Sequence, residues 1–221
     1  MNIPDNLLGE AWCWAAWAVW LSLFALAVWR APWGRLKDSE HLNVWLGMIV
    51  LLTLIWSLKA GVKPGLSMHL LGATVFTLCF GRQLAFIGVS LVLAGVTING
   101  ASGYFSYALN ALLLAGVSVV ISHLFLILVQ RFLPKHFFVY IFVNGFVGAA
   151  LTVMGVGLVS TLFLGFSGAY DFDYLISEYL PYFILLGFSE AWLSGMLMTL
   201  FVVYRPNWVF TFDDSLYLAK K

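Results

Sequence analysis

Residues 107–129 read YALNALLLAGVSVVISHLFLILV, an apolar run that contains no Asp, Glu, Lys or Arg. A membrane-spanning helix needs about 20 mainly apolar residues to cross a hydrocarbon layer of about 30 Å. The run therefore predicts a transmembrane helix. It decides the fold class because the rest of the chain repeats the same pattern.

Similar runs, bounded by charges and by Gly or Pro, occupy most of the 221 residues. They lie at 11–29, 42–58, 68–80, 84–98, 137–166 and 180–204. The run at 68–80 would form only about 20 Å of helix, so neighbours must bury it or its flanks must extend it. We expect an all-α polytopic bundle of about seven transmembrane segments, with residues 1–221 as one integral membrane domain.

The composition excludes several other classes of protein. Hydrophobic residues make up 62% of the chain, charged residues 10%, and the net charge is +1. A soluble domain is about 25% charged, and nucleic-acid binding or disorder would require a different charge balance. The two cysteines, Cys13 and Cys79, lie in apolar stretches and are expected to be buried packing residues rather than a disulfide.

The basic residues predict the orientation. With the N-terminus outside and the C-terminus inside, nine of the eleven basic residues fall inside: Arg30, Arg35, Lys37, Arg82, Arg131, Lys135, Arg205, Lys220 and Lys221. Only Lys59 and Lys63 fall outside, as the positive-inside rule favours. No removable signal peptide is apparent, because the first ten residues carry Asp5 and Glu10 and no basic residue. The Met1 amine is therefore expected on the outer face.

Polar groups inside a membrane are costly and each requires an explanation. Glu190 is the one carboxylate well inside a predicted span. It either faces the bundle interior as a coupling group or forms hydrogen bonds that lock helix packing, and the sequence leaves both open. Since Glu190 has no evident partner at its depth, we expect no catalytic residues, no cofactor-binding residues and no enzyme activity.

His69 lies in the segment GLSMHLLG at 65–72, at the outer end of a predicted span. A neutral imidazole at the mouth of a bundle suits a divalent transition metal, although a lone histidine is more often a hydrogen-bonded structural group. The other histidines are weaker candidates. His41 and His136 are expected at the inner interface, and His123 lies deep in its span toward the inner side.

Four short motifs occur in order along the chain. They are MNIPD at 1–5, GLSMHLLG at 65–72, Asn110 ahead of a small-residue helix, and LGFSEA at 186–191. They resemble the Met-His-Ile-Pro-Asp/Glu start, the Gly-Thr-Ser-x-His-Leu-Leu-Gly segment, the Gly-Ala-Asn element and the final-helix Ile-Gly-x-Gly-Glu-Gly of the CbiM/NikM family. That family supplies the substrate-binding membrane components of energy-coupling-factor (ECF) cobalt and nickel importers.

The resemblance implies a multi-pass protein of a bacterial or archaeal plasma (inner) membrane. The implied partners are the lipid bilayer, a membrane scaffold (T-type) component and cytosolic ATPase subunits, with no nucleic acid. Its substrate would be a divalent transition metal, nickel or cobalt. Carried over by position, the metal site would comprise the Met1 amine, Asn2 and His69, and the predicted topology places Met1 and His69 on the same side.

One departure from the family stands out: Asn2 replaces the histidine at the second position. A carboxamide is a weaker metal ligand than an imidazole, although Asp5 could supply an anionic oxygen or Met68 a thioether. The possible outcomes are a changed metal, a changed substrate, or a retained fold without transport. The alternative to metal capture is therefore a non-transporting membrane subunit that supports a larger membrane complex.

Overall fold

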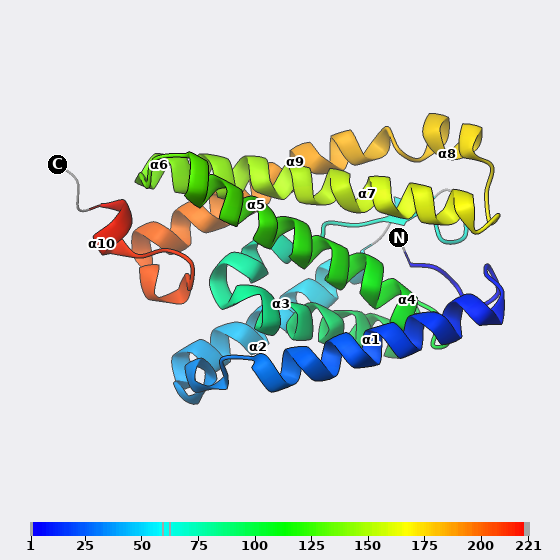
Figure 1. Ribbon diagram of the computed structural model, residues 1–221, viewed down its shortest axis with the longest axis horizontal. Helices are drawn as coiled ribbons and strands as arrows, with labels where there is room; N and C mark the ends of the chain where they lie inside the picture. Colours follow the sequence, from blue (N-terminus) through cyan, green and yellow to red (C-terminus); the bar gives the residue numbers. More distant parts are fainter. Residues whose placement is uncertain (1, 59, 62, 219–221) are drawn as a thin grey trace.

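Long helices that run along one axis build the protein, because inside a bilayer each backbone N–H and C=O must find its partner within the chain (Figure 1). The computed structural model describes residues 2–58, 60–61 and 63–218. In this part of the chain six helical stretches are long and apolar enough to cross a membrane: Glu10–Arg30 (α1), Ser39–Ser57 (α2), Ala73–Ile98 (α3), Tyr107–Phe132, Phe137–Phe166 and Tyr182–Tyr204 (α9).

Two of these stretches are composite helices. The first comprises α4 (Tyr107–Ala111), the π-helical segment η2 (Leu112–Val117) and α5 (Ser118–Phe132), and the second comprises α6 (Phe137–Val139), the π-helical segment η3 (Tyr140–Val147) and α7 (Gly148–Phe166). The remaining elements are short: η1 (Trp33–Lys37), β1 (Ala60–Gly61), β2 (Ser67–Met68), α8 (Phe172–Glu178), η4 (Pro206–Trp208) and α10 (Asp214–Tyr217). The two strands pair antiparallel, with Gly61 opposite Ser67.

Helix α3 doubles back at Gly81, which has non-helical angles of φ 77° and ψ 167°. A Cβ atom on Gly88 would lie 2.5 Å from the ring of Phe76, whereas twelve residues of straight helix would separate the two by about 18 Å. The two halves of α3 therefore pack against each other. Glycine suits position 81 because residues with a Cβ atom avoid this backbone region.

The loop after η4 closes the end of the first half of α3. Backbone N–H groups of Phe210 and Thr211 donate to the carbonyls of Cys79 (3.1 Å) and Leu78 (3.2 Å). The Thr211 hydroxyl also donates to the Leu78 carbonyl, at 2.9 Å. These bonds satisfy helix-end carbonyls that would otherwise be unpaired inside the bundle.

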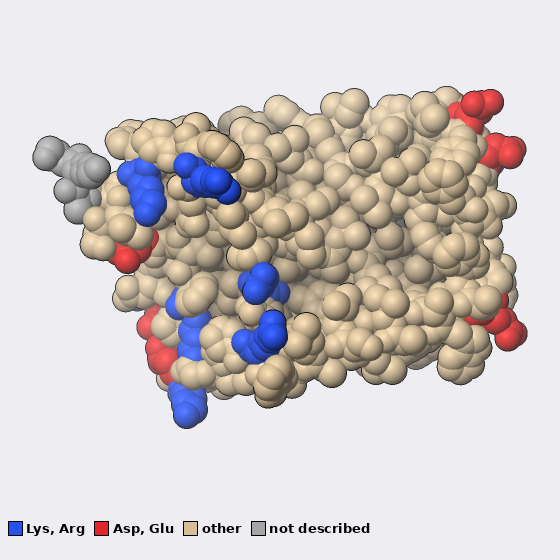
Figure 2. Space-filling model, viewed as in Figure 1, with Lys and Arg blue, Asp and Glu red and all other residues tan. Residues whose placement is uncertain are grey.

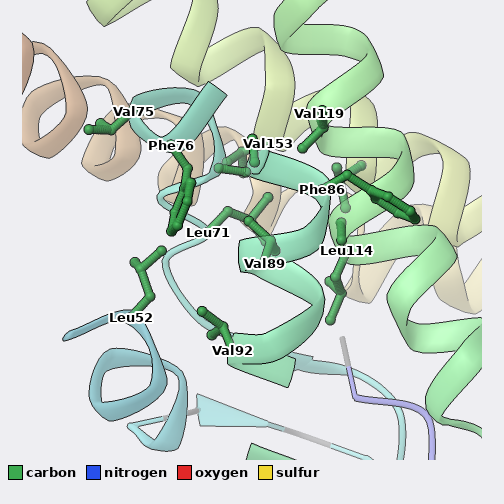
Figure 3. Close-up of a cluster of buried hydrophobic side chains, with 14 of the residues drawn as sticks. Leu52, Leu71, Val75, Phe76, Phe86, Val89, Val92, Leu114, Val119 and Val153 are labelled. Carbon is green, nitrogen blue, oxygen red and sulfur yellow. The ribbon is translucent and has the colours of Figure 1, made fainter. Parts of the chain in front are cut away.

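Both halves of α3 lie at the centre of the bundle, and most of their residues are buried. Figure 3 shows their side chains among residues from the surrounding elements: Phe76 and Val89 of α3 with Leu52 of α2, Leu114 of η2, Val119 of α5 and Val153 of α7. Helices α1 and α2 instead bury only three residues each, as expected of helices that face lipid.

The two ends of the bundle differ in charge (Figure 2). On the face shown, Lys and Arg gather toward the end that carries α10. The charged side chains visible at the end that carries α8 and the start of α1 are acidic. At the basic end the α1–α2 connection meets the chain after α9: Arg35 donates to the Asn207 carbonyl at 2.8 Å, and the ring of His41 lies 2.9 Å from the same oxygen. Hydrogen bonds from the Glu40 N–H and from His41 hold the pKa of Asp38 below its usual range.

The structure confirms the predicted fold class, an all-α polytopic membrane bundle. The predicted runs 68–80 and 84–98 both lie around α3, and Gly81 separates them. The start of the first run is not helical: Ser67–Met68 form β2, and the helix begins only at Ala73. The short run is thus buried by its neighbours and not lengthened by its flanks, while the count of seven spans and the N-out orientation stay predictions.

Candidate metal site

The segment before α1 folds back into the bundle and docks on the start of α4 (Figure 1). Ile3 is 2% exposed. Its N–H donates to Asn110 Oδ1 at 2.8 Å, and its carbonyl accepts from Asn110 Nδ2 at 2.9 Å and from the Ser106 hydroxyl at 2.6 Å. The Asn110 amide pairs with this backbone as a neighbouring β-strand would. It therefore fixes the position of the residues that precede Ile3.

Asp5 fastens the same segment to the loop before α4. Its Oδ1 accepts from the backbone N–H of Ser106 at 2.8 Å and from the Ser106 hydroxyl at 3.0 Å, and its Oδ2 accepts from the N–H of Tyr104 at 3.1 Å. Both carboxylate oxygens are thus engaged beside a helix start, where a negative charge is favourable. Asp5 serves to hold the segment in this structure, and the idea that it supplies a metal ligand in place of a histidine finds no support.

His69 follows β2 and is buried, at 3% exposure. Its ring packs on Trp56 of α2, with ring centroids 4.4 Å apart. Nδ1 lies 3.2 Å from the Leu70 carbonyl oxygen. Because a carbonyl only accepts, a neutral His69 carries its proton on Nδ1 and its lone pair on Nε2, the arrangement that orients a metal-binding imidazole.

The structure brings Asn2 close to the His69 segment. The Asn2 N–H donates to the Ser67 hydroxyl at 3.2 Å, and Asn2 Nδ2 lies 3.5 Å from the Ala101 carbonyl oxygen. Side chains two residues apart in an extended segment face the same side. Ser67 and His69 are both buried and Met68 is less so, which fits an alternation with the Ser67 and His69 side chains on one side of the segment and Met68 on the other.

The third predicted ligand, Met1, lies outside the described residues, so its position relative to His69 is not tested. Asn2 itself is buried, and its Oδ1 accepts no hydrogen bond from the described residues. No group of three or more His, Cys, Asp or Glu side chains in ranges 2–58, 60–61 and 63–218 could hold a metal ion. The described part of the site is therefore one imidazole and one amide oxygen.

Glu190 of α9 holds the backbone that follows His69. Its Oε2 accepts from the Leu71 N–H at 2.9 Å, its Oε1 accepts from the Gly72 N–H at 2.6 Å, and the Ser194 hydroxyl donates to Oε1 at 3.3 Å. Gly72 is the N-cap of α3, with φ 64°, a left-handed angle that favours glycine. The carboxylate thus caps α3 and ties α9 to the His69 loop, which is the packing role that the sequence left open.

A cavity of about 720 Å³ opens on this end of the bundle. The N-terminal segment, the β1–β2 hairpin and the loop after α3 line it, through residues that include Asn2, Lys63, Ser67 and Ala101. Lys63 also stacks on Tyr174, with Nζ 3.8 Å from the ring centroid. The cavity gives solvent a route to the place where Asn2 meets Ser67.

The other histidines lie apart from this site. His41 bonds to Asp38 and Asn207 at the basic end, and His136 caps α6. Sequence reasoning identified His69, Glu190 and Asn110 but did not assign Trp56 or Ser67 a role. The Ser-x-His spacing was a signal for Ser67, whereas nothing in the sequence connects Trp56 with His69.

Comparison with known proteins adds independent information. Residues 2–208 match the family described as "CbiM: Cobalt uptake substrate-specific transmembrane region". A crystal structure of a truncated transition metal transporter is similar in fold, with a TM-score of 0.79 at 16% identity over 92% of this chain and 99% of that chain. A second transition metal transporter structure gives a TM-score of 0.75 at 16% identity over 90% and 91%. No curated protein matches the chain significantly.

Proposed function

The chain belongs to the CbiM family of cobalt-uptake transmembrane proteins, and we propose that it captures a divalent transition-metal ion where its N-terminal segment docks. It is a multi-pass transport protein rather than an enzyme. One observation carries the proposal. The Asn2 N–H rests on Ser67, and Ser67 lies two residues before a buried imidazole that the Leu70 carbonyl orients.

The proposed ligands are His69 Nε2, the Met1 amine and Asn2. The buried Asn2 Oδ1 supports a role for the Asn2 side chain, because no described residue donates to it. Nitrogen and amide-oxygen donors suit borderline ions, and nickel and cobalt are both within this range. An asparagine in place of an imidazole weakens the site, so we expect lower affinity than a site with two histidines would have.

Delivery of the ion requires partners. The chain carries no phosphate-binding loop motif, so energy must come from another subunit. We propose a membrane scaffold (T-type) component and cytosolic ATPase subunits of an ECF importer, in a bacterial or archaeal inner membrane. The site would face outward and the basic end would face the ATPases, an arrangement that the positive-inside rule supports.

Metal analysis of the purified protein with an authentic N-terminus tests the proposal. We expect bound nickel or cobalt in the parent chain and at least about a 100-fold loss of affinity in His69→Ala, because even outer ligand contacts contribute about 10–100-fold. His136→Ala removes an exposed imidazole far from the site and is the matched control. Unchanged affinity in His69→Ala, or after residues are added ahead of Met1, would refute the site.

A non-transporting membrane subunit on the same scaffold is the second candidate. The asparagine at position 2, together with the lack of a multi-residue ligand cluster among the described residues, favours it. The two candidates differ in whether the purified protein binds a metal ion and in which partner it retains. Stable co-purification with a partner that is not an ATPase, with no metal bound, would support the subunit role over metal capture.

A further inference from the structure

A second cavity, of about 290 Å³, lies near the basic end of the bundle, between α1, the start of the second half of α3, and the η2–α5 segment. Arg30, Arg82 and Gln83 form its polar rim. Its walls are apolar and include Leu23, Leu26 and Val120. The cavity is separate from the candidate metal site, since it shares no residue with the cavity beside Asn2.

Neither arginine of this cavity forms an ion pair with a residue that the structure describes. Among the described residues, the ion pairs within 4.0 Å are His41–Asp38 and Arg205–Glu40, and neither involves Arg30 or Arg82. Arg30 lies over the neutral Trp29 ring, with its Cζ atom 5.8 Å from the ring centroid. Two unpaired guanidinium groups on one rim favour an anion, and the planar guanidinium matches phosphate oxygens.

The depth of the cavity places these arginines at a membrane boundary. Arg30 lies twenty residues from the start of α1, about 30 Å along the helix. Arg82 lies sixteen residues from the end of α3, about 24 Å from the same end of the bundle. One hydrocarbon layer is about 30 Å thick. The rim therefore lies where lipid headgroups meet hydrocarbon.

The cavity walls face outward, toward lipid. Leu23, Leu26 and Val120 are 44%, 42% and 55% exposed. Phe86 and Val119 close the inner side and are buried. A water-filled anion site would leave these apolar walls wet, whereas an acyl chain covers them. The combination of a basic rim with an apolar wall is the pattern of a headgroup pocket between transmembrane helices.

We propose that this cavity is a binding site for one anionic phospholipid. The phosphate headgroup lies between Arg30 and Arg82, and one acyl chain covers Leu23, Leu26 and Val120. The occupant is lipid rather than an acidic protein segment, because the walls continue into the lipid-facing surface of α1 and α5. The proposal does not depend on which metal, if any, the other end of the molecule binds.

Native mass spectrometry of the full chain, exchanged into mixed phosphatidylglycerol and phosphatidylcholine nanodiscs, tests the site. We expect one phosphatidylglycerol to stay bound after delipidation. Its affinity should fall about 30-fold in the double variant Arg30→Gln/Arg82→Gln, since each basic side chain at an anionic surface contributes about fivefold. Arg131→Gln is the matched control, because Arg131 ends α5 outside the cavity and stacks on its neighbour Phe132 as Arg30 stacks on Trp29.

A second variant keeps both charges and fills the space. Gly116 lines the cavity, and a Cβ atom there would have its nearest contact at 3.8 Å, on Phe86. Gly116→Leu should therefore fold, as thermal unfolding will verify, and release the lipid as the double variant does. Parallel samples with inorganic phosphate alone test whether the two arginines bind a free phosphate without an acyl chain, and we expect no retained phosphate.

Three results would overturn the proposal. They are equal retention of phosphatidylcholine, a loss in Arg131→Gln as large as in the double variant, or full retention in Gly116→Leu. Displacement of the lipid by a co-purified protein that contacts Arg30 and Arg82 would also overturn it, in favour of a protein interface. Selective loss in both cavity variants, with Arg131→Gln unchanged, would support it.

Discussion

Asn2 is held in place by its backbone and by the residue that follows it. Its N–H bonds to Ser67 and the next residue pairs with Asn110. The side chain is buried, yet its Oδ1 receives no hydrogen bond from the described residues. The backbone of Asn2 therefore meets the segment that leads to His69, while its side-chain amide lies beside the Ala101 carbonyl.

Asn2→His should strengthen metal binding. An imidazole is a better ligand for nickel and cobalt than a carboxamide, and we expect a gain of about tenfold or more, the lower bound that even outer contacts contribute. Isothermal titration with nickel and cobalt measures it. Asn6→His is the matched control, because Asn6 is exposed in the same segment. An equal gain in both variants would mean that the new histidine binds at the surface.

Single residues could be predicted from the sequence where their chemistry is unusual for a membrane. His69 and Glu190 were identified in this way, and both are buried as expected. Their connection was not predictable, because Glu190 lies about 120 residues away and reaches the backbone of Leu71 and Gly72 rather than the imidazole. Backbone partners leave no signal in side-chain spacing.

At the scale of elements, the contact between α9 and the start of α3 decides where His69 lies. One carboxylate accepts two backbone N–H groups at once, so α9 is tied directly to the loop that follows His69. Residues 69–72, between β2 and α3, belong to no helix or strand. Irregular backbone at this depth is tolerated only when the protein supplies partners.

Glu190→Gln should lower metal affinity by about 10–100-fold, as loss of an outer contact does at metal sites. The amide has one acceptor oxygen, and its NH₂ group would face a backbone N–H donor, so one of the two bonds is lost. Nickel titration measures the effect, and hydrogen exchange at Leu71 and Gly72 reports on the loop. Glu178→Gln alters an exposed carboxylate at the same end and should change neither. Unaltered affinity in Glu190→Gln would mean that the hydrogen bonds from Leu71 and Gly72 to this carboxylate do not contribute to metal binding.

Gly81→Ala should destabilise the protein by about 1–3 kcal/mol, the usual cost of a residue held in a sparsely populated backbone region. The added Cβ would also lie 3.2 Å from the Phe210 ring. Thermal unfolding in detergent measures the change. Gly47→Ala is the control, because Gly47 lies inside α2 with open space beside it and should be neutral or slightly stabilising. Equal stability of the two variants would contradict the strained turn.

At the scale of the whole molecule, Lys and Arg gather toward the end that carries α10 on the face shown in Figure 2, and this asymmetry predicts the orientation. Cysteines introduced at Asn6 and Lys37 test it, because both positions are exposed and lie at opposite ends. A membrane-impermeant maleimide should label Asn6→Cys in intact cells and Lys37→Cys only after lysis. The native thiols of Cys13 and Cys79 are buried and give little background. The reverse labelling pattern would show that the N-terminus lies inside and would contradict the predicted orientation.

The fold class was predictable because long apolar runs report directly on lipid, whereas the orientation that the basic loops predict stays a prediction. The sequence indicated two adjacent apolar runs on either side of Gly81, but it did not indicate that the chain turns back there. Its cause lies in a distant part of the chain, where Phe210 and Thr211 satisfy the carbonyls of Cys79 and Leu78. Contacts between residues so far apart in sequence do not appear in local patterns.

The first half of α3 is a rod of eight residues, about 12 Å long. One end of this helix follows the His69 segment at Gly72, and the other end bonds to the backbone of Phe210 and Thr211. A subunit that binds the loop around Thr211 would therefore contact one end of a short helix whose other end follows the His69 segment. Any movement of the loop around Thr211 would thus reach the residues next to His69 through one short helix, without passing through the rest of the bundle.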